Sequence, residues 1–302
     1  MTIDEAAKKI AVTVYGTVVT SLTPTITYTG ASIDPALGVA RNFTNPVTYI
    51  VTAEDGSTAT YTVTVTVIFT DMSDIEDYLA AAPAPVSLPV ALNLASDWTN
   101  LLAKIQAAGK DVELDLSACT MSGTEFNPGV ADTGERYIVS LVLPDAATGI
   151  KAGVYPNSTF RYFTGLTEVS GTGITGVGNY TFYTCTTLSS VTLPAATTVG
   201  HYAFTGCTAL SSVSLPAATT ISDYAFSACT ALTDLTFGRD AAPWPTLGEN
   251  VFSFTGTGTL TIHVPSGTVS HYTAAWGVPV SVSAGNSVYG TNHKKINIID
   301  TP

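Results

Sequence analysis

Three glycines in the stretch GTGITGVG have the spacing of a nucleotide-binding turn. Gly171, Gly173 and Gly176 follow the pattern G-x-G-x-x-G. Such a turn binds a pyrophosphate when it joins a strand to a helix, and an acidic residue about 20 positions later then holds the ribose. Residues 191–198 read VTLPAATT and contain no acid. The spacing therefore needs another explanation, which a repeat supplies.

Three cysteines recur at a fixed interval of 22 residues, at Cys185, Cys207 and Cys229. Stacked repeats could bring their sulfur atoms together for a metal or a disulfide. Phe163 occupies the same position one interval earlier, which favours a column of buried thiols, because free cysteine packs as a small hydrophobe. The four histidines are scattered and no C-x-x-C or H-x-x-x-H spacing occurs. We expect no metal site and no cofactor.

The sequence offers no catalytic constellation. There is no G-x-S-x-G elbow, and the regular repeats carry mostly Ser and Thr rather than converging acids and bases. A polysaccharide lyase built on a β-solenoid is the enzymatic alternative, and it would need such a convergent patch. We therefore assign no catalytic residue and expect that the protein is not an enzyme.

The interval of 22 extends to other residue types and defines a repeat. Within each unit a stretch such as LSSVTLP alternates like a short strand and ends at proline. A period of 22 is typical of leucine-rich solenoids, in which stacked units share one core. We predict about seven parallel strands, centred on residues 114, 141, 169, 191, 213, 235 and 262. Gly171 takes the place of Leu193 and Leu215, so the glycine run is a degenerate repeat turn. The main columns are Phe160, Phe182, Phe204 and Phe226; Leu166, Leu188, Leu210 and Leu232; Val169, Val191, Val213 and Leu235; and Val177, Val199 and Ile221.

The stretch LSSVTLPAATTVGHYAFTGCTALSSVSLPAATTISDYAFSACTAL resembles the BspA-like, or Treponema-type, leucine-rich repeats of bacterial surface proteins. The resemblance covers roughly residues 112–275, and VPSGTVSHYTAAW resembles the closing segment of such arrays. It implies a mainly β fold with short helices, export and surface display. It also implies a role as an adhesin or interaction module that binds host matrix proteins or other cells.

Residues 1–68 form a separate domain. KKIAVTV, TPTITYT, PVTYIVTA and ATYTVTVTV alternate apolar residues with Thr, the signal of half-buried strands, and AEDGST supplies a hairpin turn. The segment resembles the small immunoglobulin-like β-sandwich that often precedes such repeats. The module's usual first strand is missing from the pattern. Two alternatives follow: further residues belong before Met1, or the sandwich has an unpaired edge.

Residues 69–95 are expected to be a linker with a short helix. Ser73 and Glu76 form a capping box, and the helix should end before Pro83. The solenoid is expected over residues 96–302. Its first element is a helix in SDWTNLLAKIQAAGK, capped by Ser96 or Asp97, ended by Gly109 and covering the first coil. Its buried face is expected to hold Trp98, Leu101, Leu102 and Ile105.

Two surfaces of the repeats are candidate binding sites. Tyr180, Tyr202 and Tyr224 form a ladder that offers rigid apolar faces with polar tips, or is half-buried and structural. The outward side of the strands is polar and somewhat acidic, and is either a ligand face or an inert solvated one. It lacks the Arg and aromatic residues that dominate protein hot spots. Its candidate residues are Glu113, Asp115, Glu168, Asp234, Thr236 and His263.

Composition limits the function further. The chain of 302 residues has a formal net charge of −12, and only 11% of its residues are charged. An acidic chain without a basic cluster is unsuited to nucleic acid. No apolar run approaches 18 residues, so no membrane span is expected, and residues 1–20 do not form a signal peptide. We expect an extracellular, monomeric bacterial protein that binds another protein or a glycan. The alternatives are a structural spacer and a carbohydrate-binding protein.

Overall fold

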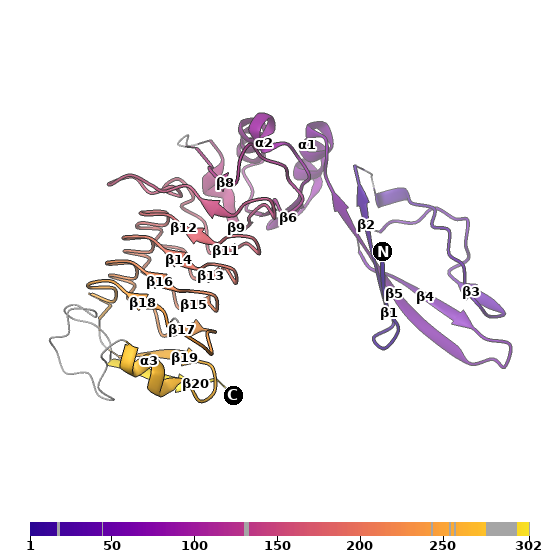
Figure 1. Cartoon of the computed structure of the whole chain (residues 1–302). Coiled ribbons are helices and arrows are strands. Elements are labelled where there is room, and N and C mark those ends of the chain that lie inside the picture. Colours follow the sequence, from indigo (N-terminus) through magenta and orange to yellow (C-terminus); the bar gives the residue numbers. More distant parts are fainter. Residues whose placement is uncertain are drawn as a thin grey trace. The chain divides into compact units, whose positions relative to one another are not determined.

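The chain divides into two compact units, Met1–Ile75 and Glu76–Pro302. Figure 1 shows the computed structural model, which describes residues 1–16, 19–43, 45–129, 133–242, 244–253, 255–256, 258–275 and 295–301. The first unit holds one five-stranded sheet. The second unit is a stack of coils with two parallel sheets. No helix among these residues is long and apolar enough to cross a membrane.

The first unit is built on a sheet in the order β1-β2-β5-β4-β3. β2 and β5 run parallel, and the other pairs are antiparallel. The predicted hairpin is confirmed: Asp55 accepts hydrogen bonds from the main chain and hydroxyl of Ser57, and Gly56 takes a φ of 81°. Phe43, Tyr49 and Val63 form the core. The elements are β1 (Thr2–Asp4), β2 (Lys9–Tyr15), the 3-10 helix η1 (Val19–Ser21), β3 (Ser32–Asp34), β4 (Val47–Thr52) and β5 (Thr58–Ile68).

One expected strand of this unit is not formed. TPTITYT, residues 23–29, has an alternating exposure pattern over its first half, yet none of its residues belongs to a strand. Its main chain makes no hydrogen bond to any other described residue. Among the described residues, the layer opposite the sheet is therefore this segment and η1 rather than a second paired sheet. The alternation was a correct signal of burial, but it could not supply a pairing partner.

The second unit contains a long sheet of nine parallel strands. The seven predicted strands are confirmed, and their central residues lie opposite one another from Leu114 to Ile262. Residues 86–89 add a strand at one end, although they were expected in the linker, and residues 295–300 add one at the other. The strands are β6 (Val86–Pro89), β7 (Val112–Asp115), β9 (Ile138–Val142), β11 (Glu168–Ser170), β13 (Ser190–Thr192), β15 (Ser212–Leu215), β17 (Asp234–Phe237), β19 (Thr259–Val264) and β20 (Lys295–Asp300).

A second parallel sheet was not expected as such. Val177, Val199 and Ile221, predicted to be a core column, are buried on its two-residue strands. Six successive coils, from the one that holds β7 to the one that holds β17, therefore contribute one strand to each sheet (Figure 1). The strands are β8 (Glu125–Phe126), β10 (Gly149–Ile150), β12 (Gly176–Val177), β14 (Thr198–Val199), β16 (Thr220–Ile221) and β18 (Thr246–Leu247).

The first two α-helices of the chain begin at caps other than those expected. Asp71, rather than Ser73, caps α1 (Met72–Ala81), because its carboxylate accepts from the main chain and hydroxyl of Ser73. Asn93, rather than Ser96 or Asp97, caps α2 (Leu94–Ala108) by accepting from the N–H of Ala95. The remaining elements are η2 (Glu135–Tyr137) and α3 (Val269–Ala275).

α2 covers the first coil, as predicted. The indole N–H of Trp98 donates a hydrogen bond to the carbonyl of Pro128 at 2.8 Å, and the indole ring packs edge-on against Phe126 of β8. Gly109 ends the helix in the left-handed conformation, with its N–H bonded to Ile105. The expected buried face is confirmed for Leu101, Leu102 and Ile105.

Identical side chains stack along the interior of the coils. The phenylalanine column has ring centroids 4.6 Å apart between Phe160 and Phe182, 5.1 Å between Phe182 and Phe204, and 5.2 Å between Phe204 and Phe226. These distances match the spacing of neighbouring strands, about 4.8 Å. The sheet spacing therefore sets the aromatic packing, and all four rings are buried.

Phe204→Ala should lower the free energy of unfolding by about 3–5 kcal/mol, because it leaves a cavity between two stacked rings. Chemical denaturation followed by circular dichroism measures the loss. Thr192→Ala, on the exposed side of β13, should change stability by no more than about 0.5 kcal/mol. Equal effects of the two substitutions would contradict a stability based on the interior column.

Candidate functional site

The outward side of the long sheet, called here the strand face, carries two continuous rows of side chains. The parallel register places each residue beside its equivalent in the next coil. The result is a long surface on which half of the residues carry a hydroxyl group and four carry a carboxylate. The first row is Ser87, Glu113, Ser140, Glu168, Ser190, Ser212, Asp234, Thr261 and Asn297, and the second is Pro89, Asp115, Val142, Ser170, Thr192, Ser214, Thr236, His263 and Ile299.

The structure brings three of the six predicted strand-face residues together. His263 Nε2 lies 3.2 Å from Asp234 Oδ1, and Thr236 lies beside His263 in the register. The hydroxyl of Thr233 donates to Asp234 and, with His263, lowers the pKa of that carboxyl. The face is thus least uniform at β17 and β19.

The other three predicted residues lie apart from that group. Glu113 and Asp115 are on β7, and Glu168 is on β11. Asp115 also accepts a hydrogen bond from the N–H of Ser117, which ties its carboxylate to the local turn. The acidic residues are therefore spread along the sheet and do not form one pocket.

The tyrosine ladder is a stack of nearly parallel rings. The centroids of Tyr180 and Tyr202 are 5.1 Å apart, those of Tyr202 and Tyr224 are 4.8 Å apart, and both interplanar angles are 3°. Each tyrosine is half-buried and has a φ between 53° and 58°. Main-chain hydrogen bonds to the next coil hold this uncommon conformation, for example from Tyr202 N–H to Asp223.

Stacking determines what the ladder can offer a ligand. Within the ladder each ring face is covered by its neighbour, so only ring edges and hydroxyl groups point outward. At one end, Asn250 donates to the hydroxyl of Tyr224 at 3.0 Å. At the other end, the ring centroid of Tyr155 lies 6.0 Å from that of Tyr180. The interior of the ladder is therefore structural, and its available aromatic surface is at the Tyr155 end.

Sequence reasoning missed Tyr155. Its side chain is 65% exposed and the neighbouring Val154 is 76% exposed. With Tyr180 and Tyr183 it forms what we call the tyrosine cluster, with ring centroids 5.7–6.0 Å apart. Tight main-chain pairing between Val154 and Asn157 makes the hairpin that presents it.

A signal for this hairpin was present in the repeat interval. Gly149 and Ile150 pair with Gly176 and Val177, whose equivalents in the next coil are Thr198 and Val199. The first of these coils is 27 residues long and the second is 22. The extra residues form the exposed hairpin, because an insertion must leave the closely packed interior.

Comparisons with known proteins agree with this architecture. Residues 153–274 match, in six copies, the family model described as BspA type leucine rich repeat region. The repeats are BspA-type leucine-rich repeats. Residues 1–65, most of the first unit, match the model described as SGBP, N-terminal. A search of the curated proteins found no match.

A solved structure of a leucine-rich repeat protein from Bacteroides ovatus is similar over part of its length. It is 18% identical, with a TM-score of 0.35, and the match covers 62% of this chain. This chain spans 45% of that protein.

The cysteines of the leucine-rich repeats are buried thiols, as predicted. All four cysteines are free and at most 5% exposed. Cys207 and Cys229 donate to the carbonyls of Phe182 and Phe204, one coil earlier, both at 3.0 Å. Burial raises the pKa of Cys185 to about 12 and that of Cys119 to about 11. A high pKa suppresses the thiolate, which is the reactive form.

The expectations of no metal and no catalysis stay predictions. In the part of the chain that the structure describes, no three His, Cys, Asp or Glu side chains gather as a metal site requires. Among the described residues of the repeats, the strand face and the tyrosine cluster are the candidate binding surfaces.

Thiol labelling tests the buried column. At pH 8 the folded protein should react slowly or not at all with a thiol reagent, and all four cysteines should react in denaturant, because the reagent needs access to a thiolate. Absorbance of the released chromophore counts the reacting groups. Fast labelling of the native protein would show that the column opens or is misplaced.

Cys185 should also make stability depend on pH. In the unfolded chain this thiol ionises near pH 9, whereas in the folded chain it stays protonated until about pH 12. The unfolded state therefore loses its proton first, and the contribution to stability falls as pH rises above 9. Measured by urea denaturation at pH 8 and pH 10.5, the stability advantage over Cys185→Ala should shrink by roughly 1–2 kcal/mol. An unchanged difference would mean that the folded thiol titrates normally.

Proposed function

We propose that this chain is a bacterial cell-surface or secreted binding protein whose leucine-rich repeats engage a protein of a host matrix or of another cell. The repeat family supports an interaction role, and surface or secreted display is usual for such repeats. The observation that carries the proposal is the tyrosine cluster. Large apolar side chains that are mostly exposed in a soluble domain mark a contact surface, and Tyr is enriched among the residues that dominate binding energy.

A basic side chain beside the cluster adds to this surface. Arg161 lies over the ring of Tyr162 at 4.2 Å and bonds to Asn157 of the hairpin. In a chain with a net charge of −12, a cation beside exposed aromatic residues is a local exception. The cluster therefore has the Tyr and Arg composition of a protein hot spot, which the strand face lacks.

A glycan is the second candidate ligand. The first unit matches the N-terminal domain of the glycan-binding-like SGBP family, which favours it. Sugar recognition by stacking needs open aromatic faces, and the ladder covers the faces of its own rings. Tyr155 is the exposed ring at the end of that stack. A glycan would thus contact the cluster at one ring, whereas a protein can cover the whole hairpin.

The third candidate, a spacer without a ligand, is supported by the uniform Ser and Thr surface of the regular coils. On that hypothesis the tyrosine cluster would have no partner. The three hypotheses therefore differ in what Tyr155 contacts, and substitution of that residue separates them.

Tyr155→Ala should weaken binding at least tenfold to whichever protein the chain selects from an array of matrix proteins and glycans. The reason is the loss of a central apolar contact, worth about 2 kcal/mol at a hot spot. Biolayer interferometry with the full chain measures the change. The fold should be unaffected, since the side chain is 65% exposed.

Two variants serve as controls. Tyr15→Ala removes a tyrosine that is 59% exposed in the first unit and should leave binding unchanged. Glu168→Lys with Asp234→Lys reverses charge on the strand face. If only this pair weakens binding and flattens its salt dependence, the strand face is the site. Selection of a glycan alone would replace the protein partner, and no selection at all would favour the spacer.

A further inference from the structure

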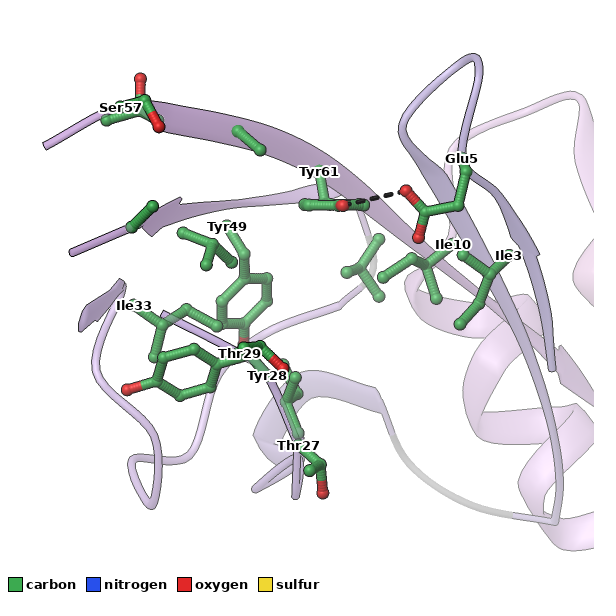
Figure 2. A pocket seen from close by; sticks show the side chains of 16 residues that line it. Ile3, Glu5, Ile10, Thr27, Tyr28, Thr29, Ile33, Tyr49, Ser57 and Tyr61 are labelled. Carbon is green, nitrogen blue, oxygen red and sulfur yellow. Dashed lines mark hydrogen bonds between the residues drawn. The ribbon is translucent and has the colours of Figure 1, made fainter. Parts of the chain in front are cut away.

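A cavity in the first unit opens to solvent. It has a volume of about 460 Å³ and is bounded by the sheet on one side and residues 26–29 on the other (Figure 2). Its lining is mainly aliphatic and aromatic. The large side chains of this lining include Ile3, Ile10, Ile26, Tyr28 and Tyr49.

Two of these side chains are in unfavourable surroundings: an isoleucine is exposed to solvent, and a buried tyrosine lacks a hydrogen bond. Ile3 of the edge strand β1 is 52% exposed. Tyr49 is 2% exposed and projects from β4 toward residues 28 and 29, yet its hydroxyl has no hydrogen-bond partner among the residues that the structure describes (Figure 2). A buried polar group without a partner costs about 1–3 kcal/mol. Packing in this unit is thus incomplete in the isolated chain.

The segment along the cavity is an unpaired β edge. Residues 23–29 alternate Thr with Pro24, Ile26 and Tyr28, as a strand does, but their main-chain groups bond to no described residue. The segment is nevertheless held at both ends. Leu22 exchanges two main-chain hydrogen bonds with Arg41, and Ala31 donates to Thr52 at 2.7 Å. A fixed, extended edge with free N–H and C=O groups is a template for strand addition.

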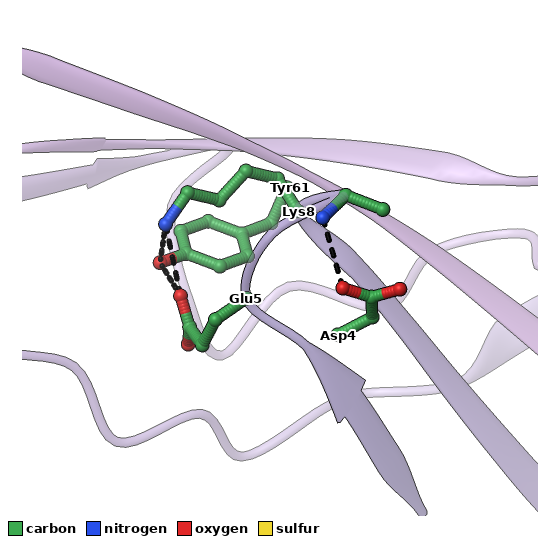
Figure 3. A network of polar contacts seen from close by, with 5 residues as sticks. Asp4, Glu5, Lys8 and Tyr61 are labelled. Atoms are coloured by element: carbon green, nitrogen blue, oxygen red, sulfur yellow. Dashed lines mark hydrogen bonds and ion pairs between the residues drawn. The ribbon is translucent and has the colours of Figure 1, made fainter.

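Charge around the opening favours one kind of strand. Asp4 and Glu5 lie at the β1–β2 turn, and Glu54 and Asp55 lie in the β4–β5 turn. Figure 3 shows how the first turn is arranged: Glu5 binds the ammonium of Lys8 at 2.9 Å and the hydroxyl of Tyr61 at 3.0 Å. Lys8 and Lys9 offset Asp4 and Glu5 at this turn, whereas the β4–β5 turn contains no basic residue, so an incoming chain meets uncompensated acidic groups at the β4–β5 turn.

We propose that a β-strand of a partner protein pairs with residues 25–29 and places its alternate apolar side chains in this cavity. The strand carries aliphatic or aromatic residues at every second position and Lys or Arg at the end that lies beside the β4–β5 turn. A second copy of this chain would offer its own residues 23–29, which alternate in the same way but contain no Lys or Arg, so charge does not favour that occupant. The site is on the first unit and is independent of the tyrosine cluster.

A peptide library tests the proposal on the full chain. Eight-residue peptides with apolar residues at alternate positions and lysine at both ends should bind saturably by isothermal titration calorimetry. Peptides of the same composition in scrambled order should bind at least tenfold more weakly. Replacing the terminal lysines by glutamate should weaken binding and reverse its dependence on salt. Absence of saturable binding throughout the library overturns the proposal.

Two variants at one position locate the contact. Thr27→Pro removes a main-chain donor that bonds to no described residue, so the free protein should remain folded, while peptide affinity should fall at least tenfold. Thr27→Val keeps the donor and should bind as the parent does. Equal affinities of the two variants would exclude pairing along this edge.

Hydrogen exchange supplies an independent readout. The bound peptide should protect the amides of residues 25–29, and these amides should exchange freely in the unbound chain. Protection confined to β1 or β3 would place the peptide on a different edge. Protection without peptide, together with a dimer in analytical ultracentrifugation, would show that a second copy occupies the cavity.

Discussion

The distance between neighbouring parallel strands controls the second unit. Hydrogen bonding sets that distance near 4.8 Å, so equivalent side chains of successive coils must pack directly on one another. Phenylalanine rings separated by 4.6–5.2 Å meet this condition inside, and tyrosine rings separated by 4.8 and 5.1 Å meet it at the surface. Threonine meets it by bonding: the hydroxyl of Thr197 donates to Thr175 and that of Thr219 to Thr197. Any residue in a column must tolerate its own copy as a neighbour, which explains the scarcity of charge in the regular coils.

The same constraint separates structural from functional surface. A residue repeated in every coil is used by its neighbours, as the covered faces of Tyr202 show, and so has little left for a ligand. Departures from the period are different. The insertion that presents Tyr155 and the pair formed by Asp234 and His263 have no equivalents in the adjacent coils. Binding specificity in such an array is therefore expected where the repetition is broken, and the regular coils act as the frame that holds those sites.

Much of the second unit could be predicted because its pattern is local and repeated. The columns at Phe, Cys and Leu gave strand positions, register and burial together. The ends could not be predicted in the same way: β6 lacks the repeat signature, and its pairing with β7 depends on long-range contacts. Helix caps failed for a related reason. Asp71 and Asn93 compete with nearby Ser and Asp residues of similar capping preference, and tertiary packing decides among them. Tyr155 could not be predicted from the columns, because it lies in an insertion that has no equivalent in the regular repeats.

The two units treat the edges of their sheets differently, and this difference has a physical consequence. The first coil of the repeats is covered: α2 packs on β8 through Trp98, and Lys110 caps the last carbonyls of α1. Such covering keeps a parallel sheet from adding foreign strands. The first unit instead leaves residues 23–29 extended, fixed at both ends and beside an apolar cavity. An uncovered edge of this kind has an aggregation cost, which the acidic β4–β5 turn reduces by repelling other copies of an acidic chain. The same negative charge repels other copies of this acidic chain and attracts a basic strand. Charge therefore selects the partner of this edge before any side chain enters the cavity.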